Sequence, residues 1–172
     1  MGSSVMHTVL IPIRSASLEQ LSPADSDILL GNARLLQRAT APSQTGNLLR
    51  GKKLALLCES DAGADADLFR SAAAALGAHV SHIRPRLSDL SEPEVLQHTA
   101  RMLGRLYDGI ECQGLTPALV EAVGLEAGVP VYDGLASPSH PTARLAALLG
   151  GEEAPGEMRE LVLQTVLLST LP

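Results

Sequence analysis

The stretch LALLCESDAGADADLFRSAAAALGAH, residues 54–79, combines a short apolar run, an acidic loop and an alanine-rich segment that stops at Gly77. The apolar run is typical of a buried strand in a parallel sheet, and residues 65–76 have the composition of a helix. A strand, a short loop and a helix in this order form a layout with which many proteins hold a phosphate at the helix N-terminus. Here the loop residues carry only acidic charges, at Glu59, Asp61, Asp65 and Asp67.

The alternation of apolar runs and helical segments continues along the chain in both directions. Strands are predicted at residues 52–59, 79–84, 108–113 and 129–134, and helices at residues 22–38, 65–76, 92–107, 117–128 and 140–149. This order predicts an α/β fold: a doubly wound three-layer sandwich with a four-stranded parallel sheet and helices on both faces.

The last segment, residues 155–171, has apolar side chains around most of a helical circumference, so we expect a helix buried against the domain or against a neighbouring chain. A chain of 172 residues is long enough for one complete core. We therefore expect a single domain over residues 1–172, closed by this returning helix.

Composition and charge exclude several classes of function. The net charge is −6, and no cluster of Lys and Arg with interleaved aromatic residues is present, so neither nucleic acid nor an anionic membrane is an expected partner. The beginning of the chain lacks the apolar run of a signal peptide or membrane span, which favours a cytoplasmic protein. Cys58 and Cys112 lie in apolar runs as expected for reduced core thiols, and neither metal-ligand spacing nor a dinucleotide fingerprint occurs. We expect no metal and no cofactor.

Several pieces of the sequence together resemble one known family. They are LLRGKKLALLCE at residues 48–59, TARMLGRLYDGI at 99–110 and VPVYDGLASPSHPTARLAALL at 129–149. In their order and spacing they resemble the amino-terminal, carbamoyl-phosphate-binding domain of aspartate and ornithine carbamoyltransferases, from about Leu18 to Gly150. The tail LVLQTVLLSTL resembles the last helix of that family, which packs on the first domain. In the family a second, amino-acid-binding domain precedes that helix, and here GGEEAPGE stands in its place, as in a trimmed first domain.

The chain departs from the family where the resemblance implies chemistry. The family's Ser-Thr-Arg-Thr-Arg phosphate loop corresponds to residues 62–66, in which both arginines are alanine and the second threonine is Asp65. The arginine that polarises the carbamoyl group corresponds to Gln113. In the family's His-Pro-x-Gln motif, His140 and Pro141 are kept, but Ala143 replaces the glutamine.

Two interpretations of these acids and of His140 stay open. Asp65 or Asp61 is expected to cap the helix and occupy the amides that a phosphate would use, so carbamoyl phosphate should not bind tightly. Alternatively, the acids receive a cationic ligand or a metal ion. His140 either serves the turn geometry at a helix start or donates to the carbonyl of a small ligand, with Gln113 and Thr142 facing the same crevice at the carboxyl edge of the sheet.

The sequence therefore predicts a non-catalytic carbamoyltransferase-like module for assembly or for binding a small molecule. The alternative is a half-enzyme that acts with a partner chain or on a different small substrate. No catalytic residue is assigned, and the resemblance implies a homotrimer. The candidate ligand-binding crevice comprises Asp61, Ala62, Gly63, Asp65, Gln113, His140 and Thr142.

Overall fold

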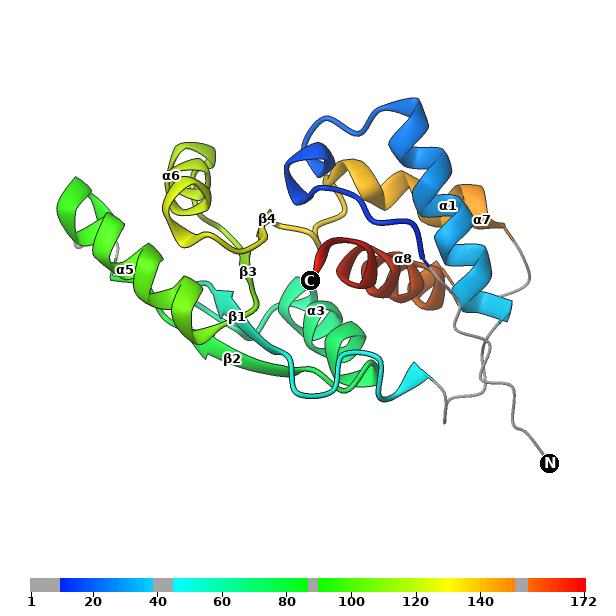
Figure 1. Ribbon diagram of the computed structural model, residues 1–172, viewed down its shortest axis with the longest axis horizontal. Coiled ribbons are helices and arrows are strands. Elements are labelled where there is room, and N and C mark those ends of the chain that lie inside the picture. The colour runs from blue at the N-terminus through cyan, green and yellow to red at the C-terminus, as the bar shows by residue number, and fades with distance from the viewer. Residues whose placement is uncertain (1–9, 39–44, 87–89, 151–154) are drawn as a thin grey trace.

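The computed structural model describes residues 10–38, 45–86, 90–150 and 155–172. Strands and helices alternate through the central part of the chain (Figure 1). The strands are β1 (Lys53–Leu57), β2 (His79–Ile83), β3 (Gly109–Cys112) and β4 (Val131–Asp133). The helices are α1 (Pro23–Arg38), α3 (Ala64–Ala75), α5 (Pro93–Leu106), α6 (Pro117–Ala127), α7 (Leu145–Leu149) and α8 (Pro155–Thr170), with 3₁₀ turns η1 (Ser15–Leu18) and η2 (Pro141–Arg144).

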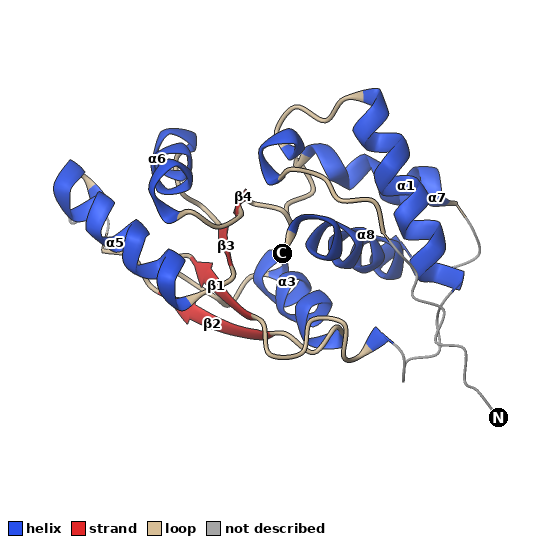
Figure 2. Ribbon diagram, viewed as in Figure 1, coloured by secondary structure: helices blue, strands red, loops and turns tan. Residues whose placement is uncertain are grey.

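The four strands form one parallel sheet in the order β2-β1-β3-β4 (Figure 2). β1 pairs with β2 on one side and with β3 on the other, so that Leu57 at its carboxyl end lies between Ile83 and Cys112. The chain thus leaves β1 toward one edge and later continues toward the other. Such a reversal opens a crevice at the carboxyl ends of β1 and β3, where α/β proteins commonly bind ligands. The predicted four-stranded parallel sheet is confirmed.

Helices cover both faces of the sheet, as predicted. α5 and α6 lie on one face and share a core with the side chains of Ile110 and Cys112. On the other face α3 and α8 pack side by side, and α1 and α7 lie against the side of α8 away from α3 (Figure 1). Leu54 and Leu56 of β1 point into this second core together with Phe69 of α3.

The C-terminal helix α8 is buried on most of its circumference. Val162, Leu163, Val166 and Leu167 are at most 2% exposed. Its hydroxyl side chains are satisfied within the helix, because those of Thr165, Ser169 and Thr170 each donate to the carbonyl four residues earlier. The phenol of Tyr132 in β4 lies 2.6 Å from the Thr170 hydroxyl and ties the end of α8 to the sheet.

A buried amide joins α1, α8 and the segment before η1. The side chain of Asn32 is buried and accepts the Ile11 N–H at 3.1 Å, while its amide donates to the Ile11 carbonyl at 2.8 Å and to the Ser169 hydroxyl at 3.0 Å. The Ile13 N–H in turn donates to the Ser169 carbonyl at 2.8 Å. These bonds tie the segment before η1 to α1 and α8.

α5 and α6 approach most closely at a glycine. A Cβ atom added to Gly104 of α5 would lie 1.7 Å from the Ala127 carbonyl oxygen of α6. This distance is far below any van der Waals contact, so the absence of a side chain at residue 104 is what permits the close packing of the two helices.

Most element boundaries lie within one or two residues of those predicted. Ser22 and Thr116 cap α1 and α6 as expected, accepting the N–H groups of Asp25 and Leu119. The helix predicted at residues 140–149 is instead divided into η2 and α7. Along the described parts of the chain, no helix is both long and apolar enough to cross a bilayer.

Candidate functional site

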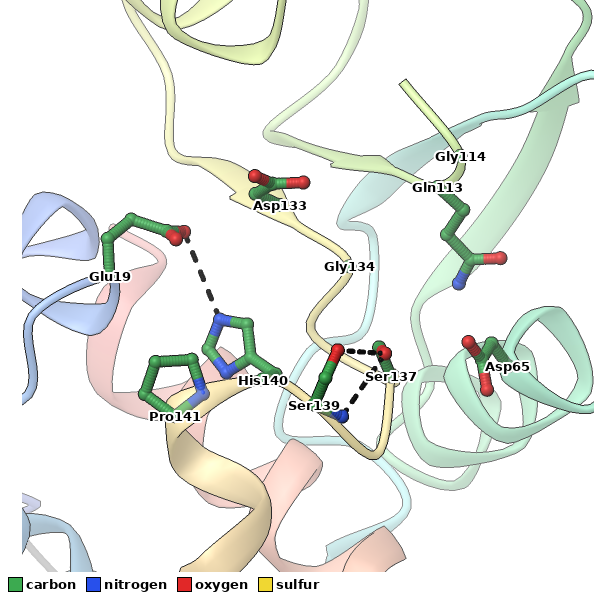
Figure 3. A pocket seen from close by; sticks show the side chains of 10 residues that line it. All are labelled: Glu19, Asp65, Gln113, Gly114, Asp133, Gly134, Ser137, Ser139, His140 and Pro141. Atoms are coloured by element: carbon green, nitrogen blue, oxygen red, sulfur yellow. Dashed lines mark hydrogen bonds and ion pairs between the residues drawn. The ribbon is translucent and has the colours of Figure 1, made fainter. Parts of the chain in front are cut away.

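Two adjacent pockets lie at the carboxyl edge of the sheet. The first, the His140 pocket, has a volume of about 310 Å³ and lies between the ends of β3 and β4, the loop of residues 134–141 and Glu19 (Figure 3). The second, the Ser60 pocket, has a volume of about 430 Å³ and is lined by residues 58–60 and 63–66. Asp65, Gln113 and Gly114 line both pockets, so the two are neighbours.

The Ser60 pocket occupies the position of the phosphate site suggested by the sequence, and the capping expected there is wrong. The N-cap of α3 is Gly63, in extended conformation, and no side chain bonds to the first turn from that position. Glycine at the N-cap leaves the cap without a side-chain acceptor. The first turn instead carries Asp65 and Asp67, whose negative charge complements the helix dipole.

Asp61 is held away from the helix N-terminus by an arginine of α3. Arg70 donates to the Asp61 carboxylate and, at 3.1 Å, to the Asp61 carbonyl, and it lies 3.6 Å from the Asp67 carboxylate. His82 Nε2 donates to the Cys58 carbonyl at 2.8 Å, which leaves Nδ1 facing the Asp61 carboxylate at 3.5 Å. The cation nearest to the loop is therefore engaged by acids of the loop and of its own helix.

His140 presents an unpartnered donor to the first pocket. Its Nδ1 accepts the Thr142 N–H at 3.2 Å and lies 2.8 Å from the Thr142 hydroxyl, so the ring proton is on Nε2. Nε2 is buried without a hydrogen-bond partner and faces Glu19 Oε1 at 3.9 Å, outside hydrogen-bond distance (Figure 3). Burial, assisted by the charge of Arg159, lowers the pKa of His140 to about 4, so the ring is neutral at physiological pH.

The His140 pocket is negatively charged. Glu19, Asp65 and Asp133 come from three separate parts of the chain and line it, and no Lys or Arg of the described residues lines either pocket. Burial raises the pKa of Glu19, and repulsion from Asp133 raises it further. Burial likewise raises the pKa of Asp133. Both shifts have the direction expected where burial disfavours the charged form of a carboxylate.

Two polar side chains, Glu111 and Arg159, hold the loop that carries His140. The fully buried Glu111 of β3 accepts the N–H groups of Leu135 and Ala136 at 2.9 and 3.3 Å, and burial raises its pKa to about 8. From α8, Arg159 donates to the carbonyls of Ala136 and Ser137 at 2.8 and 3.3 Å. The loop is therefore fixed from both sides and the pocket is pre-organised.

The structure brings together only part of the predicted crevice. Gly63, Asp65, Gln113 and His140 line the two pockets. Asp61 and Ala62 line neither of them, and Thr142 is buried beneath His140, where it fixes the ring. His140 thus does start a turn, as one interpretation had it, and also points a donor into a pocket, as the other requires.

Sequence reasoning missed several lining residues. They are Glu19, Glu59, Ser60, Asp133, Ser137 and Ser139. Asp133 could have been found, because it ends the fourth predicted strand at the sheet edge where ligands bind. Glu19 follows η1, far from any strand, and has no such signal. Within the described ranges, no three His, Cys, Asp or Glu side chains are grouped so as to hold a metal ion.

Comparison with protein families and curated sequences gives consistent matches. A family model described as the carbamoyl-P binding domain of aspartate/ornithine carbamoyltransferase matches residues 14–153. An ornithine carbamoyltransferase of Cutibacterium acnes is 39% identical over 133 residues, 77% of this chain and 40% of that protein. The catabolic ornithine carbamoyltransferase 1 of Staphylococcus epidermidis is 36% identical over 137 residues, 80% of this chain and 41% of that protein. The chain spans about two fifths of the length of these relatives.

Solved structures show the same likeness. The ornithine carbamoyltransferase of Pyrococcus furiosus superimposes with a TM-score of 0.65 at 27% identity, covering 81% of this chain and 45% of that one. The aspartate transcarbamoylase of Trypanosoma cruzi in complex with phosphate gives a TM-score of 0.62 at 26% identity, covering 81% of this chain and 44% of that one.

Proposed function

Because the chain belongs to the aspartate/ornithine carbamoyltransferase family through its carbamoyl-P binding domain, we propose that it is a non-catalytic member that binds a small molecule at the carboxyl edge of its sheet. The observation that carries this proposal is the negative charge of the His140 pocket and the Ser60 pocket. Glu19, Glu59, Asp65 and Asp133 line them, and the nearby Arg70 is paired with Asp61 and Asp67.

The physical chemistry of phosphate binding supports the proposal. A phosphate dianion needs fixed donors and cations to offset the loss of its hydration. A carboxylate within about 4 Å repels it by roughly 1–4 kcal/mol, depending on screening, whereas the N-terminus of a helix offers only about half a positive charge. Asp65 lies in the first turn of α3, where the phosphate of the family would be bound.

The residues that replace the family's phosphate loop also line the Ser60 pocket. Gly63, Ala64 and Ala66 line it together with Asp65. Since the resemblance aligns the two alanines with the phosphate-binding arginines, the pocket keeps the place of the anion site without its cations. Transfer of a carbamoyl group requires electrostatic stabilisation of developing negative charge, which an acidic pocket opposes.

The proposal includes a homotrimer in the cytoplasm, as the resemblance implies. Met102 and Leu106 of α5 and Leu125 of α6 are apolar and between 44% and 80% exposed, and a subunit contact over α5 and α6 would cover them. The two buried cysteines are unpaired, which is consistent with a reducing compartment. Sedimentation equilibrium of the purified chain tests the assembly, and a stable monomer at working concentrations would contradict it.

Calorimetric titration with carbamoyl phosphate, with inorganic phosphate as a control, tests the proposed function. We expect no binding of either up to millimolar concentration and no carbamoyl transfer to ornithine or aspartate. The Asp65→Asn variant should bind phosphate more tightly than the wild type, because it removes the charge at the α3 N-terminus. Glu94→Gln, which makes the same charge change on an exposed part of α5, is the matched control. Micromolar binding of carbamoyl phosphate by the wild type would restore the alternative of a half-enzyme.

A further inference from the structure

Nε2 of His140 is a buried hydrogen-bond donor at the His140 pocket. Its side chain is only 1% exposed, it points into the pocket, and its proton has no acceptor. A buried donor without a partner costs free energy, and in a native structure it commonly marks the place of a missing partner. A ligand atom that accepts this proton is the simplest such partner.

Resting on the proposed small-molecule function, we propose that the His140 pocket binds an organic cation, a primary ammonium or guanidinium compound, that also carries a neutral carbonyl or hydroxyl oxygen. The cationic group is placed between Glu19 and Asp133, in the pocket that Asp65 also lines, and the neutral oxygen accepts the Nε2–H of His140. Two independent features of the site support this ligand. The carboxylates of the pocket support its cationic group, and His140 supports its neutral oxygen.

The cationic group of the ligand is inferred from the charges of the residues that line the His140 pocket. Three carboxylates reach the pocket from the segment after η1, from the first turn of α3 and from the end of β4, and none of the described cations lines it. A ligand cation would relieve the repulsion and the burial that raise the pKa of Glu19, and the burial that raises the pKa of Asp133. An ammonium or guanidinium group has several N–H donors and can therefore bond to more than one of these carboxylates.

The neutral oxygen of the ligand is inferred from the tautomer of His140. Because the Thr142 N–H occupies Nδ1, Nε2 can only donate, and the ring stays neutral because its pKa is lowered to about 4. An acceptor is therefore required. It is a neutral one, since an anionic oxygen on Nε2 would meet Glu19 Oε1, which lies 3.9 Å from that nitrogen. The requirement for a neutral acceptor excludes amino acids that present their carboxylate to His140, and it favours amides and alcohols.

The pocket is built to hold such a ligand without rearrangement. Glu111 and Arg159 fix the loop of residues 134–137, and Thr142 fixes the His140 ring. The volume of the His140 pocket, about 310 Å³, suits a molecule of amino-acid size.

A matched set of small ligands tests the cationic group and the neutral oxygen separately. The set contains ω-amino amides from glycinamide to 5-aminopentanamide, each with the corresponding alkylamine, alkylamide and ω-amino acid, measured by calorimetric titration of the full chain. We expect at least one ω-amino amide to bind at least tenfold more tightly than its alkylamine, its alkylamide and its amino acid. Failure of every ω-amino amide to bind overturns the inference.

Variants then assign each group of the ligand to its residues. Glu19→Gln and Asp133→Asn should weaken the amino amide and the alkylamine about tenfold and leave the alkylamide unchanged, whereas the control Glu94→Gln should change none of them. His140→Asn keeps an N-cap acceptor for the Thr142 N–H but lacks the Nε2 donor. It should remove the advantage of the amino amide over the alkylamine without weakening the alkylamine.

The outcomes distinguish this inference from the proposed function. Tight binding of a neutral or anionic compound other than carbamoyl phosphate, unaffected by Glu19→Gln and Asp133→Asn, would overturn the cationic ligand and leave the small-molecule module standing. Micromolar binding of carbamoyl phosphate would overturn the proposed function itself. Stabilisation by Mg²⁺ or Zn²⁺ alone, lost in His140→Asn, would show a metal site and would also overturn the inference.

Discussion

Glu111 is a carboxylic acid in the centre of the molecule. It is fully buried, and the backbone N–H groups of Leu135 and Ala136 and the amide of Gln113 at 3.5 Å surround its carboxylate. Burial is the largest influence and raises its pKa to about 8, while these hydrogen bonds lower the pKa and offset part of the effect. The protonated form is therefore favoured in the folded protein at neutral pH, and Glu111 couples protonation to the loop that carries His140.

This coupling gives a stability that depends on pH. The folded pKa of about 8 lies above the ordinary value of 4.5, so the contribution of Glu111 is complete below pH 4.5 and is lost as the pH rises through 8. In Glu111→Gln, whose amide cannot ionise, the loss should be absent. Urea unfolding of both proteins between pH 5 and pH 9 measures it, and we expect the wild type to lose stability relative to the variant across this range. Parallel curves would contradict a protonated Glu111.

At the scale of residues, positions within a recognisable motif could be predicted from the sequence, whereas contacts between distant parts of the chain could not. His140 and Gln113 were predicted from the family resemblance, His140 through the His-Pro motif and Gln113 as the counterpart of the family's arginine. Arg70 was missed as the partner of Asp61, because it lies nine positions further along the chain, inside α3. Glu19 reaches the pocket only through the packing of the N-terminal segment, so in the sequence the interpretation of a cationic ligand rested on the loop acids alone.

At the scale of elements, the packing of α5 on α6 depends on Gly104. The Ala127 carbonyl occupies the space that a side chain at residue 104 would fill, 1.7 Å from the position of a Cβ atom. Neither helix can yield without moving away from the sheet, because Leu103 and Val123 beside this contact are both buried in one core cluster. A glycine normally weakens a helix, and here that cost is offset by close packing.

Two glycine substitutions of opposite effect test this contact. Gly104→Ala should lower the free energy of unfolding by about 2 kcal/mol or more, because the overpacking exceeds the gain of roughly 1 kcal/mol in helix propensity. Gly31→Ala in α1, where a Cβ would meet no atom within 4 Å, should instead stabilise by about 0.5–1 kcal/mol. Thermal unfolding of both variants provides the measurement, and equal effects of the same sign would count against the contact.

Element boundaries were predictable where a side chain sets them. Ser22 and Thr116 cap their helices through bonds that span three residues, and both starts were read correctly. The start of α3 was misread, because two acids beside Gly63 suggested a capping carboxylate, whereas the pairing of Asp61 with Arg70 is a tertiary interaction. The break between η2 and α7 likewise has no local signal, since proline at residue 141 suits the start of either kind of helix.

At the scale of the whole molecule, α8 is part of the core. It packs against α1, α3 and α7, and its side chains join those of β1 and α3 in one cluster. The parallel sheet and its two covered faces followed from the alternation of sequence patterns, and α8 followed from apolar residues on most of its circumference. Which elements it contacts could not be read from the sequence, because an apolar helix pattern does not name its neighbours.

A charged substitution in α8 should therefore unfold the sheet as well as the helix. Val166→Asp places a carboxylate at a site that is 0% exposed and should cost about 4 kcal/mol or more, a large part of the stability of an ordinary domain. Leu148→Asp in α7, at 59% exposure, should change stability by less than about 0.5 kcal/mol. In the wild type, hydrogen exchange should give similar opening free energies for β1 and α8. Rapid exchange in α8 beside a protected sheet would instead show a separable appendage.

The bond between Tyr132 and Thr170 also makes the protein its own optical reporter. The chain contains no tryptophan and only two tyrosines, so Tyr107 and Tyr132 supply its ultraviolet emission. The Tyr132 phenol is buried at the meeting point of β4 and the last turn of α8, while Tyr107 lies beyond the end of α5 in a less buried position. Displacement of α8 would hydrate one fluorophore and spare the other. Docking of the C-terminal helix can thus be followed in solution without a label, at concentrations low enough to separate folding from association.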